Sequence, residues 1–332
     1  MTAGEAGSSA AADGPSMLDL IRLSPRPIFP PGGRDLYRQI AILSDMEAGR
    51  EVLVVGCGRG VTAEFFVREF EVQGSGVDDR PDLVEEAEDR ARREDLQDRL
   101  QFQSAPLDEL PYRDGVFDVV VAELGLTARA EPADAMGELV RVTKPGGRVV
   151  LVQPVWKAPV PEERRRILGR HLGAHPLMMV EVKRILREAG VHRFHTEAWS
   201  DADTAFRSGA RKPFPDFAEL FTLREKLAIL RRAWRRWGWK GVRQALSREM
   251  EVHRLLTRER ILGLDMITGV RRLPPEDPEP GGADGAPGPD DSKVPASDDS
   301  DATEAPEVGE ALADPGPGHD EQIPFPLNDS TP

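Results

Sequence analysis

The chain has 332 residues, of which 44 are Lys or Arg and 58 are Asp or Glu, so its formal net charge is −14. A single cysteine, Cys57, excludes an internal disulfide framework and favours a reducing compartment such as the cytoplasm. No apolar run approaches the roughly 20 residues of a membrane span, and the first residues lack the basic-then-apolar order of a signal peptide.

The negative charge is concentrated near the end of the chain. Residues 273–332 contain 16 Asp or Glu and one Lys, whereas residues 1–272 are close to neutral. The acidic segment is rich in Pro and Gly and has hardly any aromatic or β-branched residues, so it cannot bury enough apolar surface to offset the entropy cost of ordering. We therefore expect a disordered acidic tail over 273–332, and a flexible lead over 1–30.

The most informative stretch is VLVVGCGRG, which begins at Val52. Its four apolar residues form a run too short for a helix, and Gly56, Gly58 and Gly60 end that run at alternate positions. A helical pattern follows over 63–70. Such a strand-to-helix junction presents backbone N–H groups, and glycines let a ligand approach the chain closely. The stretch predicts a site for a nucleotide-like cofactor.

The spacing of these glycines distinguishes between cofactors. The dinucleotide fingerprint G-x-G-x-x-G needs a third glycine where this chain has Val61, which disfavours an NAD-dependent oxidoreductase. The G-x-G-x-G pattern resembles motif I of the class I S-adenosylmethionine (SAM) methyltransferases, in which the turn wraps the methionine end of SAM. The resemblance implies cofactor contacts from Gly56, Cys57, Gly58 and Gly60. For Cys57 itself, a small packing residue is favoured over a reactive thiol.

The second predicted strand, 71–77, ends in two carboxylates. Asp78 follows Gly58 by 20 residues, the interval at which a carboxylate at the tip of the second strand can accept both ribose hydroxyls. Asp78 is therefore the favoured ribose ligand. Asp79 is the alternative, and it also competes for the N-cap of the helix that begins at Pro81.

The third predicted strand, 99–105, leads into the strongest match to this family. Residues 106–121 resemble its stretch "gDa..lPf.dgsFDvV", in which Phe-Asp opens the fourth strand. Ser104 stands where the family often has an Asp that contacts the adenine amino group. The Ala105 backbone and the Leu107 side chain are the further candidates for adenine recognition.

Two more residues complete the predicted site. The fourth strand ends at Glu123, and ligands of open parallel sheets bind at the carboxyl edge of the strands. Glu123 is therefore the best candidate for contact with cofactor or substrate and the one weak candidate for catalysis, with a solvated loop carboxylate as the alternative. In the family, the helix ahead of the first strand often closes the cofactor site, so Tyr37 is a further candidate. Asp118 is expected to be structural.

The remaining pattern predicts the fold class. Six strands alternate with helices, and "L.rv.kPGGrvvl" at Leu139 is another feature of the family, so we expect a doubly wound, mostly parallel, seven-stranded Rossmann-like α/β sheet. A seventh strand is missing directly after the sixth, and the candidate lies at 264–272. The predicted organisation is a SAM-binding core over 31–200, a basic helical insertion or lid over 201–263, and the last strand of the core over 264–272.

The insertion combines an apolar stripe with positive charge. Helical spacing aligns five apolar side chains, Leu223, Leu227, Leu230, Trp234 and Trp237. Residues 211–260 carry a local net charge of +8. A basic lid for an anionic substrate, an RNA-facing patch and a helix on acidic lipid headgroups are the functional hypotheses. The plain alternative is an amphipathic helix packed on the core with a solvated basic face.

The motifs together predict SAM-dependent methyl transfer to a small-molecule acceptor, with O-, N- and C-methylation all open. An RNA or protein methyltransferase that docks through the insertion, and a non-catalytic SAM-binding scaffold, are the alternatives. The sequence has no metal-binding His/Cys pattern, no Walker A motif and no nucleophile elbow, and its histidines show no diagnostic spacing for a general base. The fourth strand lacks the Asn/Asp-Pro-Pro-aromatic segment of base-amine methylases, which disfavours nucleic acid. No pattern sets an oligomeric state.

Overall fold

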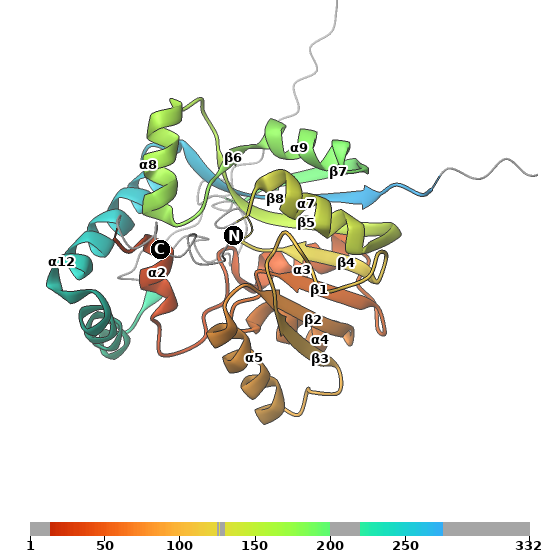
Figure 1. The fold of residues 1–332 in the computed structure, drawn as a ribbon, viewed down its shortest axis with the longest axis horizontal. Coiled ribbons are helices and arrows are strands. Elements are labelled where there is room, and N and C mark those ends of the chain that lie inside the picture. The colour runs from red at the N-terminus through yellow and green to blue at the C-terminus, as the bar shows by residue number, and fades with distance from the viewer. Residues whose placement is uncertain (1–13, 125, 127–129, 200–219, 275–332) are drawn as a thin grey trace, which may run out of the picture. The chain divides into compact units, whose positions relative to one another are not determined.

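The computed structural model describes residues 14–124, 126, 130–199 and 220–274. The predicted acidic tail lies outside these ranges, apart from its first two residues, and so does the first part of the predicted insertion. The described chain forms one compact unit around a twisted sheet (Figure 1).

The sheet has the strand order β3-β2-β1-β4-β5-β8-β7, which confirms the predicted doubly wound, mostly parallel fold. Its strands are β1 Glu51–Val55, β2 Gln73–Asp78, β3 Leu100–Ser104, β4 Phe117–Ala122, β5 Thr143–Trp156, β7 Val191–Ala198 and β8 Leu262–Arg271. Strand β8 is antiparallel and lies between β5 and β7, pairing Ile267 with Leu151. A two-residue strand, β6 Leu177–Met178, pairs with the end of β5 and was not predicted.

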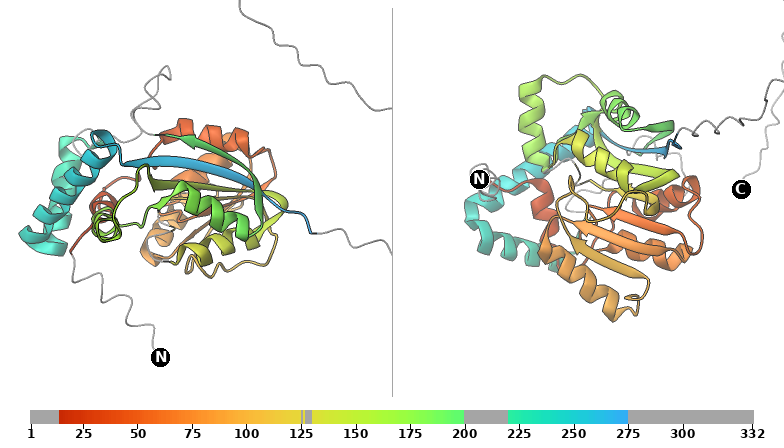
Figure 2. Two further views of the ribbon diagram at one scale, coloured as in Figure 1. Left: turned by 90° about the horizontal axis from the view of Figure 1, so that it is seen from above. Right: turned by 45° about the vertical axis from the view of Figure 1, so that its right-hand side comes forward.

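Side-chain alternation along the strands divides the core into two faces. On β1, Val52 and Val54 point to one face, and Leu53 and Val55 point to the other. The first face is covered by α3 Gly33–Leu43, α4 Val61–Phe70 and α5 Pro81–Arg93. The second face is covered by α7 Pro132–Val142 and α9 Met179–Glu188 (Figure 2).

A separate group of helices packs where β5 ends. It consists of α2 Met17–Arg22, α8 Glu162–Leu172 and α12 Leu223–Thr257, which lie together on one side of the sheet in Figure 1. Trp156 at the end of β5 is buried among residues of α8 and α12. Helix α2 lies within the segment that was expected to be a flexible lead, and its Leu20 is buried against α12. Helix α8 was not predicted.

The predicted apolar stripe of the insertion faces the core only in part. Leu230 and Trp237 pack half-buried against the cluster formed by α2 and α12, so the helix packs on its neighbours as the plain alternative expected. Helix α12 also buries Ile229 and Ala233, against Leu20 of α2. Leu223, Leu227 and Trp234 of the stripe are exposed. Hydrophobic periodicity identifies an apolar row but does not show which side of the helix has a neighbour, and here α2 covers the side of Ile229 and Ala233.

A kink divides α12 at Gly238, which has a positive φ of 66°. An Ala or larger residue would be strained in that conformation, so the glycine allows the two halves of the helix to follow different directions. The capping box of Thr222 and Glu225 marks the start of the first half.

Candidate functional site

The glycine turn connects β1 to α4 at the carboxyl edge of the sheet. The N–H groups of Gly56 and Cys57 both donate to the carbonyl of Val77, at 2.8 and 3.0 Å, and this fastens the turn to the end of β2. Gly56, Gly58 and Gly60 all have positive φ, at 74°, 52° and 73°. Gly60 is the N-cap of α4, and no side chain caps that helix.

Two of these glycines are needed for different reasons. A Cβ on Gly60 would lie 2.4 Å from the ring of Phe102, so this glycine permits close packing between the turn and β3. A Cβ on Gly58 would meet no protein atom within 4 Å. The backbone of Gly58 therefore borders open space, and a ligand can approach it there.

Cys57 is a packing residue in this turn. Its sulfur is buried, and a Cβ added to the neighbouring Gly76 would lie 2.9 Å from it. Burial, together with the charge of Asp78, raises the pKa of the thiol well above its ordinary value. A protonated, buried thiol is a poor nucleophile, which agrees with the expectation of a packing role.

Asp78 lies directly against the glycine turn. The N–H of Gly58 donates to its Oδ2 at 2.9 Å, and the N–H of Arg80 donates to its Oδ1 at 3.1 Å. Burial raises the pKa of this carboxyl, and the hydrogen bond from Gly58 acts in the opposite direction. Each carboxylate oxygen retains lone-pair capacity for another donor.

Asp79 does not cap the next helix. The N-cap of α5 is Arg80, without a side-chain cap, so the predicted capping role of Asp79 is wrong. The helix begins one residue later than a cap by Asp79 would require, because Asp78 holds the Arg80 backbone.

The three adenine candidates follow β3. Ser104 is exposed and pairs with Asp78 in the sheet. The N–H of Ala105 already donates to the Asp78 carbonyl at 3.2 Å, which leaves the Ala105 carbonyl to a ligand. Leu107 is buried in the second face beside Leu110.

Glu123 lies at the tip of β4, next to β1. Its N–H donates to the carbonyl of Val55 at 3.0 Å, and its own carbonyl accepts from the buried side chain of Gln153 at 2.8 Å. The side chain of Glu123 is buried. The alternative of a solvated loop carboxylate is therefore wrong.

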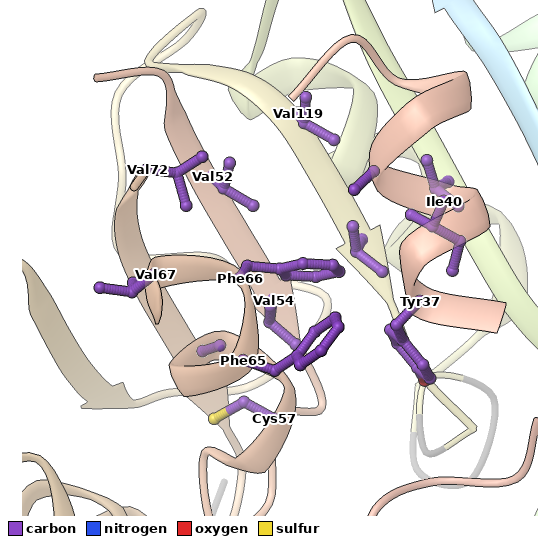
Figure 3. Packing of buried hydrophobic residues seen from close by; sticks show 14 of the residues in the cluster. Tyr37, Ile40, Val52, Val54, Cys57, Phe65, Phe66, Val67, Val72 and Val119 are labelled. Atoms are coloured by element: carbon purple, nitrogen blue, oxygen red, sulfur yellow. The ribbon is translucent and has the colours of Figure 1, made fainter. Parts of the chain in front are cut away.

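Two hydroxyls lie close to this carboxyl. Burial raises the pKa of Glu123 to about 7, and the nearby hydroxyls of Thr62 and Tyr37 act in the opposite direction. None of the three groups is aligned for a hydrogen bond, however: among the described residues, Tyr37 Oη, Thr62 Oγ1 and Glu123 Oε1 are all buried without a partner. Tyr37 lies beside the tip of β4 in Figure 3. Three unpaired polar atoms in one buried place indicate that a ligand completes them.

The N-terminal segment covers this region. Arg59, in the glycine turn, donates to the carbonyl of Ser24 at 2.9 Å and pairs with Glu86 at 2.7 Å. The ring of Phe29 packs edge-on against Tyr37 and Phe65, with centroids 5.2 and 5.3 Å away. The segment ahead of α3 is therefore held over the turn.

Several residues of this site were not predicted. Thr62 stands in the first turn of α4, where a hydroxyl after the glycines was an available signal. Gln153 is in the middle of an apolar strand, and Arg59 is one of many arginines, so neither had a local signal.

Asp118 lies at the opposite edge of the sheet, where it accepts from Glu51 N at 2.9 Å and from Lys144 Nζ at 2.8 Å.

No cluster of three or more His, Cys, Asp or Glu side chains suited to a metal ion occurs among the described residues. Within the same residues, no helix combines the length and apolar character that crossing a bilayer would need.

The chain matches known proteins over the region that builds this site. The family described as "Methyltransferase domain" matches residues 53–151. A 27-O-demethylrifamycin SV methyltransferase from Amycolatopsis mediterranei is 31% identical over 184 residues, which cover 52% of this chain and 67% of that protein. The methyltransferase GfsG of Streptomyces halstedii is 34% identical over 123 residues, but these cover only 44% of its length and 37% of this chain.

Solved structures share the fold. The [4+2]-cyclase SpnF superposes with a TM-score of 0.59 at 21% identity, covering 78% of this chain and 93% of that one. The helices around the sheet are thus included in the similarity, although a likeness at this identity concerns the fold alone.

Proposed function

The chain belongs to the class I S-adenosylmethionine-dependent methyltransferases, and we propose that it transfers a methyl group from SAM to a small-molecule acceptor. The observation that carries this proposal is the convergence of three strand tips. The turn after β1, Asp78 at the end of β2 and Glu123 at the end of β4 adjoin one another, with the Gly58 to Asp78 hydrogen bond joining the first two.

The residues fit SAM in their shape and their chemistry. The open space beside Gly58 admits a ligand to the backbone of the turn, and Asp78 offers carboxylate oxygens of the kind that accept ribose hydroxyls. Asp79 is the second candidate for that contact. Ser104, Ala105 and Leu107 would border the adenine, and the turn from Gly56 to Gly60 would border the methionine end. When bound, SAM supplies an electrophilic methyl group on a positively charged sulfur.

The chain's own contribution to the reaction would be positioning and proton removal. Methyl transfer needs the nucleophile held in line with the methyl group. A hydroxyl acceptor must also lose its proton. Glu123, with a pKa raised to about 7, is suited to accept that proton near neutral pH, and the hydroxyls of Tyr37 and Thr62 lie close to its carboxylate.

A small acceptor is supported by the helices that pack at this edge of the sheet and by the named relatives. Helices α2, α8 and α12 pack together where β5 ends, at the carboxyl edge of the sheet. One relative is named for a 27-O-demethylated small molecule, and another, from Penicillium expansum, is named as an O-methyltransferase. These names support a hydroxyl as the acceptor.

Labelled SAM tests the proposal directly. The purified protein is incubated with methyl-tritiated SAM and a cell extract, which is then divided into organic-soluble, RNA and protein fractions. We expect label in the organic-soluble fraction, and much less label with the Asp78→Ala variant at a SAM concentration near the Kd of the original protein. Label in RNA or protein would instead favour docking of a macromolecule, and binding of SAM without label in any fraction would favour a non-catalytic scaffold.

A second measurement separates two roles of Glu123. If the carboxylate removes a proton from the acceptor, Glu123→Gln lowers kcat and leaves the Kd for SAM near its original value. If it binds the methionine ammonium group, the same substitution weakens SAM binding in calorimetry. The sequence has Val54 where the family often has an acidic residue, so the ammonium needs an acceptor elsewhere.

A further inference from the structure

The first half of α12 exposes large apolar side chains in one row. Leu223, Leu227 and Trp234 are 73%, 62% and 53% exposed, although side chains of their size are usually covered. Their spacing of four and seven residues places them on one face of the helix. Beyond the kink, Trp239 is 75% exposed as well.

A row of positive charge runs beside this apolar row. Arg224, Arg231 and Arg235 are spaced by seven and four residues, so they too share one strip of the helix, which adjoins the strip of the apolar side chains. All three are exposed, and none forms an ion pair with a residue in the described part of the chain. Arg232 is different, because it donates to the carbonyls of Leu23 and Ser24 at the end of α2.

We propose that this face of α12, the row Leu223, Leu227 and Trp234 with its flanking arginines, docks on an anionic lipid surface. An interfacial helix needs apolar side chains that enter the acyl boundary, and cationic ones that reach the headgroup phosphates. Tryptophan is enriched at this boundary because its ring is apolar and its N–H is polar. The face has all three properties, and α2 packs on an adjoining side of the helix, against Ile229 and Ala233.

Charge argues against a second copy of the chain as the occupant. A symmetric dimer through this row would bring the arginine row of one copy close to that of the other, and like charges at an interface are costly. Anionic headgroups remove that repulsion. The docking face belongs to α12, which lies with α2 and α8 to one side of the sheet, so bound lipid would lie on that side of the molecule (Figure 1).

The test is flotation of the full chain with lipid vesicles. We expect the protein to float with phosphatidylcholine vesicles that contain about 30% phosphatidylglycerol, and to stay unbound with pure phosphatidylcholine. The double variant Leu227→Asp with Trp234→Asp should lower the partition coefficient at least about tenfold, and so should Arg231→Glu with Arg235→Glu. Binding should weaken as salt is raised above ~100 mM.

Two matched controls separate this face from general surface effects. Val180 on α9 is 70% exposed, and Val180→Asp should leave flotation unchanged. The pair Arg93→Glu and Arg113→Glu makes the same charge change on exposed residues elsewhere and should weaken binding less. The melting temperatures of all variants should stay close to that of the original protein, because none of these side chains is buried.

Three outcomes would overturn the proposal. The first is vesicle binding that is absent, or that is equal for the face variants and their controls. The second is a dimer in light scattering that the Leu227 and Trp234 variant abolishes. The third is salt-sensitive binding of single-stranded RNA without lipid binding. Absence of lipid binding together with carbodiimide crosslinks from Lys226 or Lys240 to residues 275–332 would assign the face to the acidic tail.

Discussion

The backbone N–H of Gly58 donates a hydrogen bond to Oδ2 of Asp78 over 2.9 Å, between residues 20 positions apart. The flexible turn and the tip of the adjacent strand are therefore joined before any ligand binds. A ligand that contacts both finds them already oriented, so less conformational entropy is lost on binding. Gly58 was predicted to contact the methionine end of SAM, and Asp78 was predicted to contact its ribose. The two residues are thus direct neighbours in the structure.

Replacing each of two glycines by alanine should separate packing from ligand approach. Gly58→Ala adds a methyl group in open space, so the cost to stability should be only the roughly 1–2 kcal/mol of a left-handed residue. Binding of S-adenosylhomocysteine should nevertheless fall at least about tenfold, because the methyl group occupies the approach to the backbone. Gly60→Ala also collides with Phe102 and should lower the melting temperature further. Calorimetry and thermal unfolding measure the pair, and an unchanged affinity for Gly58→Ala would contradict the assignment of this space to the cofactor.

Asp78 and Asp118 form a matched pair of carboxylates at opposite edges of the sheet. Asp78→Ala should weaken SAM binding about 10- to 100-fold, in line with the roughly 1.5–3 kcal/mol of a hydrogen bond to a charged group. Asp118→Asn should lower the melting temperature, because it weakens the contacts with Glu51 and Lys144, and should leave the SAM affinity of the folded protein unchanged. Calorimetry at a temperature where both variants are folded measures the contrast, and equal losses of affinity would refute it.

Glu123 should make the stability of the ligand-free protein depend on pH. Its pKa is raised from an ordinary value of 4.5 to about 7, so between these pH values the folded protein holds a proton that the unfolded chain has released. The contribution of this group to the free energy of unfolding therefore falls as pH rises through this window, by up to about 3 kcal/mol. Glu123→Gln removes the titration, so its melting temperature should exceed that of the original protein increasingly from pH 5 to pH 8. A constant difference across this range would show that the carboxyl is not the titrating group.

Adjacent arginines of α12 should behave differently. Arg232→Ala should destabilise the protein by about 0.5–1.5 kcal/mol, because the Leu23 carbonyl loses a charged donor and α2 loses an attachment, although the Ser24 carbonyl keeps its bond from Arg59. Arg231→Ala should change stability by less than about 0.5 kcal/mol, since this exposed side chain makes no hydrogen bond within the described part of the chain, whereas Arg232 makes two. Denaturant unfolding measures both, and equal effects would contradict the distinction between a structural and a surface arginine.

Local sequence determined the part of the candidate site that consists of the glycine turn and Asp78. The apolar run before Gly56 and the glycine spacing encode a strand and a turn within a few residues, so the positions of Gly58 and Asp78 followed from short-range rules. The strand at 262–271 was also predictable, because its pattern of apolar and β-branched residues is local and does not depend on the length of the segment before it. The family resemblance predicted Tyr37 only as a contact of the cofactor, and its position beside Glu123 was not predicted.

Tertiary structure alone decided the surroundings of Glu123 and the exposed face of α12. Gln153 and Thr62 reach Glu123 from different elements, and whether a carboxyl is buried depends on neighbours that no window of sequence contains. For α12, periodicity revealed an apolar row, but the burial of Ile229 and Ala233 depended on where α2 packs. Backbone conformation is governed mainly by nearby residues, whereas burial, and with it pKa and exposure, is governed by segments that meet only after the chain has folded.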